Sequence, residues 1–162
     1  TQYLTRVQGM PDKVVKDLNK IVDDFVYAKG GAKSANAIAI ATLKAPVEEG
    51  GFKLIDLESR NNAIALMILQ RYQSPEDRRP AWARVADPLV AAAAVTRFRN
   101  VTPNLLTSPF LQSWRVFLQS KALPGSLKTM LKVAMKYNTQ CLPMTIDQDL
   151  RNAMPFWYHQ GR

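Results

Sequence analysis

The chain has 162 residues, of which 47% are hydrophobic and 22% are charged, and its net charge is +9. This composition excludes a disordered chain, and the positive charge favours a polyanionic partner. A single cysteine and a single histidine exclude an internal disulfide framework and a conventional Cys/His zinc site. No apolar run is long enough for a membrane span or a secretory signal, so we expect an intracellular protein of the nucleus or cytoplasm.

The first predicted element is a helix that follows Pro11 and ends at Gly30-Gly31. Proline suits the first turn of a helix because the N–H that it lacks has no partner there, and the glycines favour a helix end. The apolar residues of this segment recur with helical spacing and form one stripe: Val14, Val15, Leu18, Ile21, Val22, Phe25 and Val26. We expect this stripe to pack against another element.

A short second helix is predicted from the capping residue Ser34 to Pro46, which stops it. The pair Gly50-Gly51 then predicts a tight reversal, because glycine adopts positive φ without strain. At most one short extended segment is expected near 52–57. The segment 58–73 carries apolar residues around much of its circumference, which predicts a central, buried helix.

Prolines mark the predicted helix starts in the second half of the chain. The run Ser74-Pro75-Glu76-Asp77 combines a capping residue, a proline and two acids near the positive end of the helix dipole. Pro88 should kink or divide the helix that follows. After a loop over 96–107, we expect two further helices to open at Ser108-Pro109 and at Pro124.

Together these elements predict a mostly α fold of six or seven amphipathic helices, the last of them capped by Thr145 and Gln148. We divide the chain into a first segment, 1–73, and a basic helical extension, 74–162, packed on it in one compact unit. Apolar residues on the inward faces are expected to form the core: Val14, Leu18, Ile21, Phe25, Leu57, Ile64, Met67, Ile68, Trp82, Val85, Leu89, Trp114, Phe117, Leu127 and Leu131.

Positive charge is concentrated in the second half of the chain. Residues 1–80 hold 12 Lys and Arg against 10 Asp and Glu, whereas residues 81–162 hold 10 against 3, and 88–146 contain no acid. In the helix after Pro124, three lysines four residues apart form one exposed line and lack carboxylates for i,i+4 pairs. An ordinary solvated face is one interpretation. We favour a surface that contacts phosphates, made of these cations: Arg97, Arg99, Arg115, Lys121, Lys128, Lys132 and Lys136.

No motif in the chain indicates catalysis or metal binding. Ile21-Val22-Asp23-Asp24 looks like the Asp-Asp box of polymerases, but adjacent residues of a helix point about 100° apart and cannot share a metal pair. The pairs Gly30-Gly31 and Gly50-Gly51 match no phosphate-binding loop and are interpreted as structural turns. The run Trp157-Tyr158-His159 is interpreted as packing, since its histidine has no nucleophile at a suitable spacing. We expect no catalytic residue, metal site or cofactor in this chain.

Four features of residues 1–73 occur together in one known family. They are Gly9-Met10-Pro11, Asp24-Phe25-Val26-Tyr27, the run from Leu43 to Leu57 through Pro46 and Gly50-Gly51, and Asn61-Asn62-Ala63-Ile64-Ala65-Leu66-Met67. Their order and spacing resemble the region just after the palm in reverse transcriptases of LINE-type (non-LTR) retrotransposons, with Tyr27 where that family has Trp. The rest of the chain resembles the continuation in fungal elements, at Pro80-Ala81-Trp82-Ala83, Leu111-Gln112-Ser113-Trp114 and Pro155-Phe156-Trp157-Tyr158-His159.

The resemblance implies a thumb and connection segment that is not catalytic by itself. The palm, its catalytic Asp residues and their Mg²⁺ would belong to other parts of a longer polypeptide, which fits a chain that does not begin with Met. The implied partners are the RNA or DNA of the template–primer and the remainder of a reverse transcriptase. The alternative is a free-standing helical module that binds a protein. A small enzyme with an unrecognised site is the third interpretation.

Overall fold

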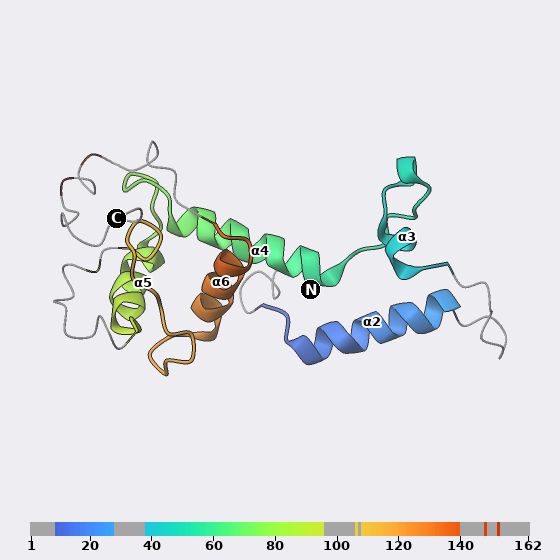
Figure 1. Ribbon diagram of the computed structural model, residues 1–162, viewed down its shortest axis with the longest axis horizontal. Helices are drawn as coiled ribbons and strands as arrows, with labels where there is room; N and C mark the ends of the chain where they lie inside the picture. The colour runs from blue at the N-terminus through green and yellow to red at the C-terminus, as the bar shows by residue number, and fades with distance from the viewer. Residues whose placement is uncertain are drawn as a thin grey trace. The chain divides into compact units, whose positions relative to one another are not determined.

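The computed structural model describes residues 9–27, 38–95, 106 and 108–139, together with Gln148 and Asn152. This part of the chain forms five α-helices and one 3-10 turn (Figure 1): α2 (Asp12–Tyr27), α3 (Ile40–Lys44), η1 (Val47–Glu49), α4 (Leu57–Tyr72), α5 (Ala81–Ala92) and α6 (Gly125–Lys136). These residues contain no strand, and Ala94 forms an isolated antiparallel bridge with Val116. The mostly α fold is therefore confirmed, with slightly fewer helices in this part than expected for the whole chain.

The chain divides into two compact units, Thr1–Ile64 and Ala65–Arg162. The boundary falls inside α4, so the first unit contains α2, α3 and η1, and the second contains α5 and α6. Among the hydrophobic residues that are buried in the described part, Leu43 alone belongs to the first unit. The hydrophobic core that the structure describes is therefore the core of the second unit.

The first helix forms where it was predicted but does not supply the core. α2 begins directly after Pro11 and buries none of its side chains. Val14, Ile21 and Phe25 are 41%, 62% and 86% exposed, so their expected place in the core is wrong. The helical spacing correctly identified the stripe, but the described part of this unit offers almost no buried apolar surface for the stripe to join.

A glycine reversal follows α3 in the first unit. Gly50 has a φ of 79°, which is left-handed, and a Cβ atom at Gly51 would collide with the carbonyl oxygen of Ala45. Across the reversal the N–H groups of Phe52 and Leu54 donate to the carbonyl of Leu43 at 3.2 and 2.9 Å. The other predicted turn glycines, Gly30 and Gly31, and the predicted helix cap Ser34 lie outside the described residues.

The carboxylate of Asp56 caps the start of α4. It accepts hydrogen bonds from the backbone N–H groups of Glu58 and Ser59 at 3.1 and 3.4 Å and from the Ser59 hydroxyl at 3.1 Å. It also pairs with Lys44 at 3.4 Å. Partial burial acts to raise the pKa of Asp56, but the Ser59 hydrogen bonds and the Lys44 charge together lower it below its ordinary value. These contacts fix the helix start within the expected 52–57 region, where no regular strand forms.

Helices α4 and α5 bury a different face from the one predicted. α4 buries Ala65, Leu69 and Tyr72, and α5 buries Ala83, Ala86 and Val90. The residues expected there are exposed, at 49% for Met67, 39% for Trp82 and 66% for Val85, while Ile64, Ile68 and Leu89 are partly buried. The predicted stripes were wrong by about one residue. In α5 two of the three buried positions are held by alanines, which a pattern of large apolar residues does not reveal.

The chain between α4 and α5 forms a turn rather than the predicted helix start. The N–H of Arg78 donates to the carbonyl of Pro75 at 2.9 Å, and regular helix begins only at Ala81. The reason is Pro80, because a proline disfavours the helical conformation of the residue before it. Pro88 was expected to kink or divide its helix, and α5 continues through it undivided.

The segment 108–123 forms turns and one bridge instead of the helix expected after Ser108-Pro109. After one turn, its backbone pairs with the end of α5: Val95 N–H donates to Arg115 at 3.0 Å, and Phe117 N–H donates to Ala93 at 2.7 Å. These long-range hydrogen bonds replace those of a helix. Trp114 is buried as expected, whereas Phe117 is 42% exposed, contrary to expectation.

The last predicted helices have different outcomes. The helix after Pro124 is confirmed as α6, and its inward residues Leu127, Leu131 and Ala134 are buried. The predicted loop over 96–107 lies outside the described residues except at Leu106. The final helix also lies largely outside them, although both described residues, Gln148 and Asn152, are helical and share a side-chain hydrogen bond of 3.3 Å.

Candidate functional site

Charges are segregated along the described part of the chain. Five ion pairs lie between residues 44 and 87: Lys44–Asp56, Lys53–Glu48, Arg78–Asp77, Arg79–Asp87 and Arg84–Glu76. The segment 108–139 contains five cations and no acid. Five acids of the region 44–87 therefore have cationic partners, while the segment 108–139 has only positively charged residues.

Helix α6 carries three of these cations. Its N-cap residue is Pro124, and the Thr129 hydroxyl donates to the Gly125 carbonyl at 3.1 Å within the first turns. At the other end the N–H and the hydroxyl of Thr139 both donate to the Ala134 carbonyl at 2.9 Å. The helix is held in place by its buried face: Leu127, Met130, Leu131, Val133 and Ala134.

The lysines of α6 lie along one line of the helix, outside its buried face. Lys132 and Lys136 are exposed, and Lys128 is partly buried. The ammonium group of Lys136 lies 5.6 Å from the ring centre of Tyr137, a cation–π contact. Because successive residues of a helix rise by about 1.5 Å, neighbouring lysines of this row are spaced by about 6 Å along the axis.

Two of the other four predicted cations belong to the described part of the chain. Arg115 and Lys121 are exposed in the segment before α6, and neither pairs with a carboxylate among the described residues. Arg97 and Arg99 lie outside the described part of the chain. The structure thus describes five of the seven predicted residues, all of them in the second unit.

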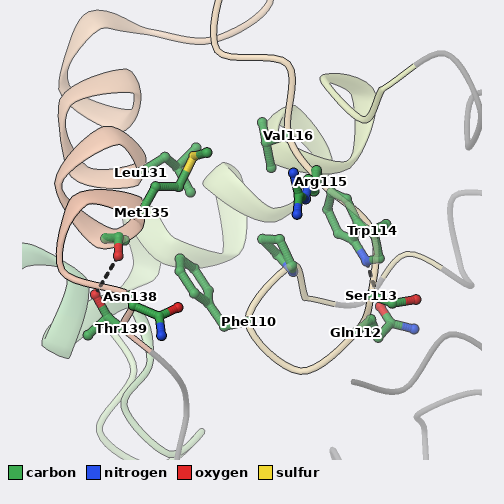
Figure 2. Close-up of a pocket in the computed structure, with 12 residues that line it drawn as sticks. Phe110, Gln112, Ser113, Trp114, Arg115, Val116, Leu131, Met135, Asn138 and Thr139 are labelled. Carbon is green, nitrogen blue, oxygen red and sulfur yellow. Dashed lines mark hydrogen bonds between the residues drawn. The ribbon is translucent and has the colours of Figure 1, made fainter. Parts of the chain in front are cut away.

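A cleft of about 410 Å³ lies between α6 and the segment 109–116. Figure 2 shows Leu131 and Met135 on the α6 side and Trp114 with Arg115 on the other side. Leu131, Ala134, Phe110 and Trp114 are buried and form its apolar wall. Polar or flexible side chains that are exposed line the same cleft: Ser113, Arg115, Met135 and Asn138.

Gln112 stabilises the conformation of the segment 109–116, which lies across the cleft from α6. Its side chain is completely buried, and its carbonyl oxygen accepts from the indole N–H of Trp114 at 2.8 Å and from the backbone N–H of Ser108 at 3.1 Å. The sequence analysis missed the role of this residue, because a glutamine followed by a serine is ordinary on the polar face of a segment assumed to be helical. Its position fixes the indole of Trp114 against the core.

A second buried polar group joins α4 to α5. The guanidinium of Arg79 makes two hydrogen bonds to Asp87, at 2.6 and 2.7 Å, and the Tyr72 hydroxyl donates to the same carboxylate at 2.8 Å. Burial and the charge of Asp87 raise the pKa of Tyr72. Burial acts to lower the pKa of Arg79, but Asp87 raises it overall. Because every charge in this group has a partner, its role is structural.

Nothing in the described residues forms a metal site. They contain no group of three or more His, Cys, Asp or Glu side chains that could hold an ion. Asp23 and Asp24 lie within α2, as the helical pattern predicted. Each helix of the described part is too short or too polar to cross a lipid bilayer.

Comparison with known proteins gave no relative: no family model, no curated protein and no solved structure matches this chain. Any function therefore has to be argued from the residues and geometry of the chain itself.

Proposed function

We propose that the second unit is a non-catalytic nucleic-acid-binding segment. The observation that carries the proposal is the charge segregation of 108–139, where five cations stand without any acid. Cations that merely keep a protein soluble are usually interspersed with acids. Like charges four residues apart on a helix repel one another, and the phosphates of a nucleic acid would relieve that repulsion.

The binding mechanism would be electrostatic. Double-stranded DNA carries one negative charge per about 1.7 Å of axis, so several phosphates lie within reach of a lysine row with a spacing of about 6 Å. Arg115 and Lys121 would add contacts beside this row. Phosphate contacts determine affinity and position but do not read sequence directly, so we expect little sequence specificity.

The resemblance to LINE-type reverse transcriptases suggests which nucleic acid this is. We propose that the chain is a thumb and connection segment that holds the template–primer beside a polymerase palm elsewhere in the polypeptide. The polymerase reaction and its Mg²⁺ would then belong to that palm. The second unit would bind the phosphates and would take part in no chemical step.

A salt series tests the proposal. If about four phosphates are contacted, the logarithm of the binding constant should fall against the logarithm of salt concentration with a slope of about −3 to −4. The variant with Lys128→Glu, Lys132→Glu and Lys136→Glu should lose most of its affinity, measured by fluorescence anisotropy with a labelled duplex.

The matched control reverses three lysines on the polar face of α2, with Lys13→Glu, Lys16→Glu and Lys20→Glu. Both triple variants change the net charge equally. A larger loss of affinity in the α6 variant would therefore show that the location of its lysines matters. Binding that does not depend on salt, or equal losses in the two variants, would contradict the proposal.

The second candidate function is a helical module that binds a protein. The exposed apolar residues of α2 favour it, because Val14, Ile21 and Phe25 lie on one stripe that the described residues do not cover. Nucleic-acid binding that survives Phe25→Lys but disappears in the α6 variant would assign the nucleic-acid role to α6 alone. A chain that binds no nucleic acid at any salt concentration would leave the module as the better interpretation.

A further inference from the structure

The cleft beside α6 combines an apolar wall with exposed polar side chains. At about 410 Å³ it falls within the range of about 300–1,000 Å³ in which proteins bind small ligands. It therefore has room for one nucleotide-sized group and not for a double helix. Its lining residues include no carboxylate.

The lining of the cleft includes one cation. Arg115 lines it from one side, and its guanidinium forms no ion pair with the described residues. On α6, Lys128 and Lys132 precede the cleft residues Leu131 and Met135 by three positions each, which makes them neighbours on the helix surface. The ligand that this arrangement suits has a flat apolar body and a negative charge.

The side chains that would meet such a body are suited to a nucleobase. Met135 is 60% exposed, and a thioether adapts to aromatic rings. The side-chain amides and hydroxyls of Asn138 and Ser113 form no hydrogen bond within the described part of the chain. Amide side chains pair with the donor and acceptor edges of bases, and the Watson–Crick edge is accessible only when the base is unpaired.

We infer that this cleft receives one unpaired nucleotide of a nucleic-acid strand, with its base against Met135 and Phe110 and its phosphate beside Arg115. The inference rests on the proposed function and adds to it a preference for single-stranded over double-stranded nucleic acid. Electrostatics alone would favour a duplex, which has the higher charge density. A preference for single strands would therefore come from the cleft.

The test compares a labelled single strand of about twelve nucleotides with the blunt duplex of the same sequence, at one ionic strength. We expect the full chain to bind the single strand about tenfold more tightly, the order that one sequestered base supplies. Two neutral variants, Asn138→Gly and Met135→Ala, should bring the ratio of affinities close to one. Glycine suits position 138 because Asn138 has a left-handed φ of 47°.

The control is Gln119→Ala, an exposed neutral change that lies outside the cleft and should keep the ratio. If both nucleic acids bind with the expected salt dependence but equally well, the cleft assignment fails and the proposed function stands. If neither binds, both fail. A ratio unchanged in both cleft variants, or displacement of the strand by an equal concentration of a free nucleoside monophosphate, would also overturn the assignment to a strand.

Discussion

At the scale of single residues, two polar side chains, one buried and one partly buried, determine local structure in the second unit. Gln112 accepts hydrogen bonds from Trp114 and Ser108, and Asp87 accepts them from Tyr72 and Arg79. In both cases one side chain satisfies donors from different parts of the chain. A buried donor that loses its acceptor has no water to replace it, so these residues should be sensitive to substitution.

Gln112→Leu should lower the free energy of unfolding by about 2–3 kcal/mol, because it leaves the Trp114 indole and the Ser108 N–H without an acceptor. Denaturant unfolding monitored by tryptophan fluorescence measures this change. The same substitution at the exposed Gln119 should change stability by less than about 0.5 kcal/mol. Equal effects at the two positions would contradict the role of the buried glutamine.

Tyr72 should make stability depend on alkaline pH. Burial and the Asp87 carboxylate raise the pKa of its hydroxyl in the folded chain, whereas in the unfolded chain it ionises near pH 10. The stabilisation from the neutral hydroxyl is therefore complete below about pH 10 and is lost as the pH rises toward the folded value. Urea unfolding of the wild type and of Tyr72→Phe at a series of pH values should show a difference that shrinks above about pH 10. A constant difference would contradict this assignment.

At the scale of elements, helix packing depends on small residues. α5 places Ala83 and Ala86 in the core at 0% and 3% exposure, while its larger neighbours Trp82 and Val85 are exposed. An alanine face allows close packing of the neighbouring elements, so the helix contributes to the core through proximity rather than through large side chains.

Ala83→Leu should destabilise the protein by about 1–3 kcal/mol, because the added atoms have no space in a close-packed core. Val85→Leu adds one methylene group at a position that is 66% exposed and should be nearly neutral. Thermal unfolding of the two variants measures the difference. A larger loss at position 85 would restore the helix face that the hydrophobic pattern predicted.

The sequence predicted the positions of helices better than it predicted their buried faces or the segments that connect them. Proline and apolar spacing located α2 and α6, because those signals are local. The rotation of α4 and α5 depends on alanines, which a pattern of large apolar residues does not weigh. The segment 108–123 departs from its predicted helix because Gln112 and the end of α5 supply hydrogen bonds from elsewhere. The cleft exists only through that departure, so the sequence could suggest its cations but not its shape.

At the scale of the whole molecule, charge is distributed unevenly. The described part of the first unit contains both acids and cations, whereas 108–139 in the second unit carries only positive charge. A net charge of +9 is therefore not spread evenly along the chain. The salt series and the two charge-reversed variants address this scale, because they ask whether the location of charge matters beyond its amount.

The absence of acids from 108–139 also has a kinetic consequence. Within a Debye length, which is about 8 Å at physiological ionic strength, no nearby carboxylate of that segment cancels the field of its cations. A polyanion that diffuses past would be attracted before any contact forms, and its association rate would exceed that of a neutral molecule. Added salt would slow its arrival as well as weaken the final complex.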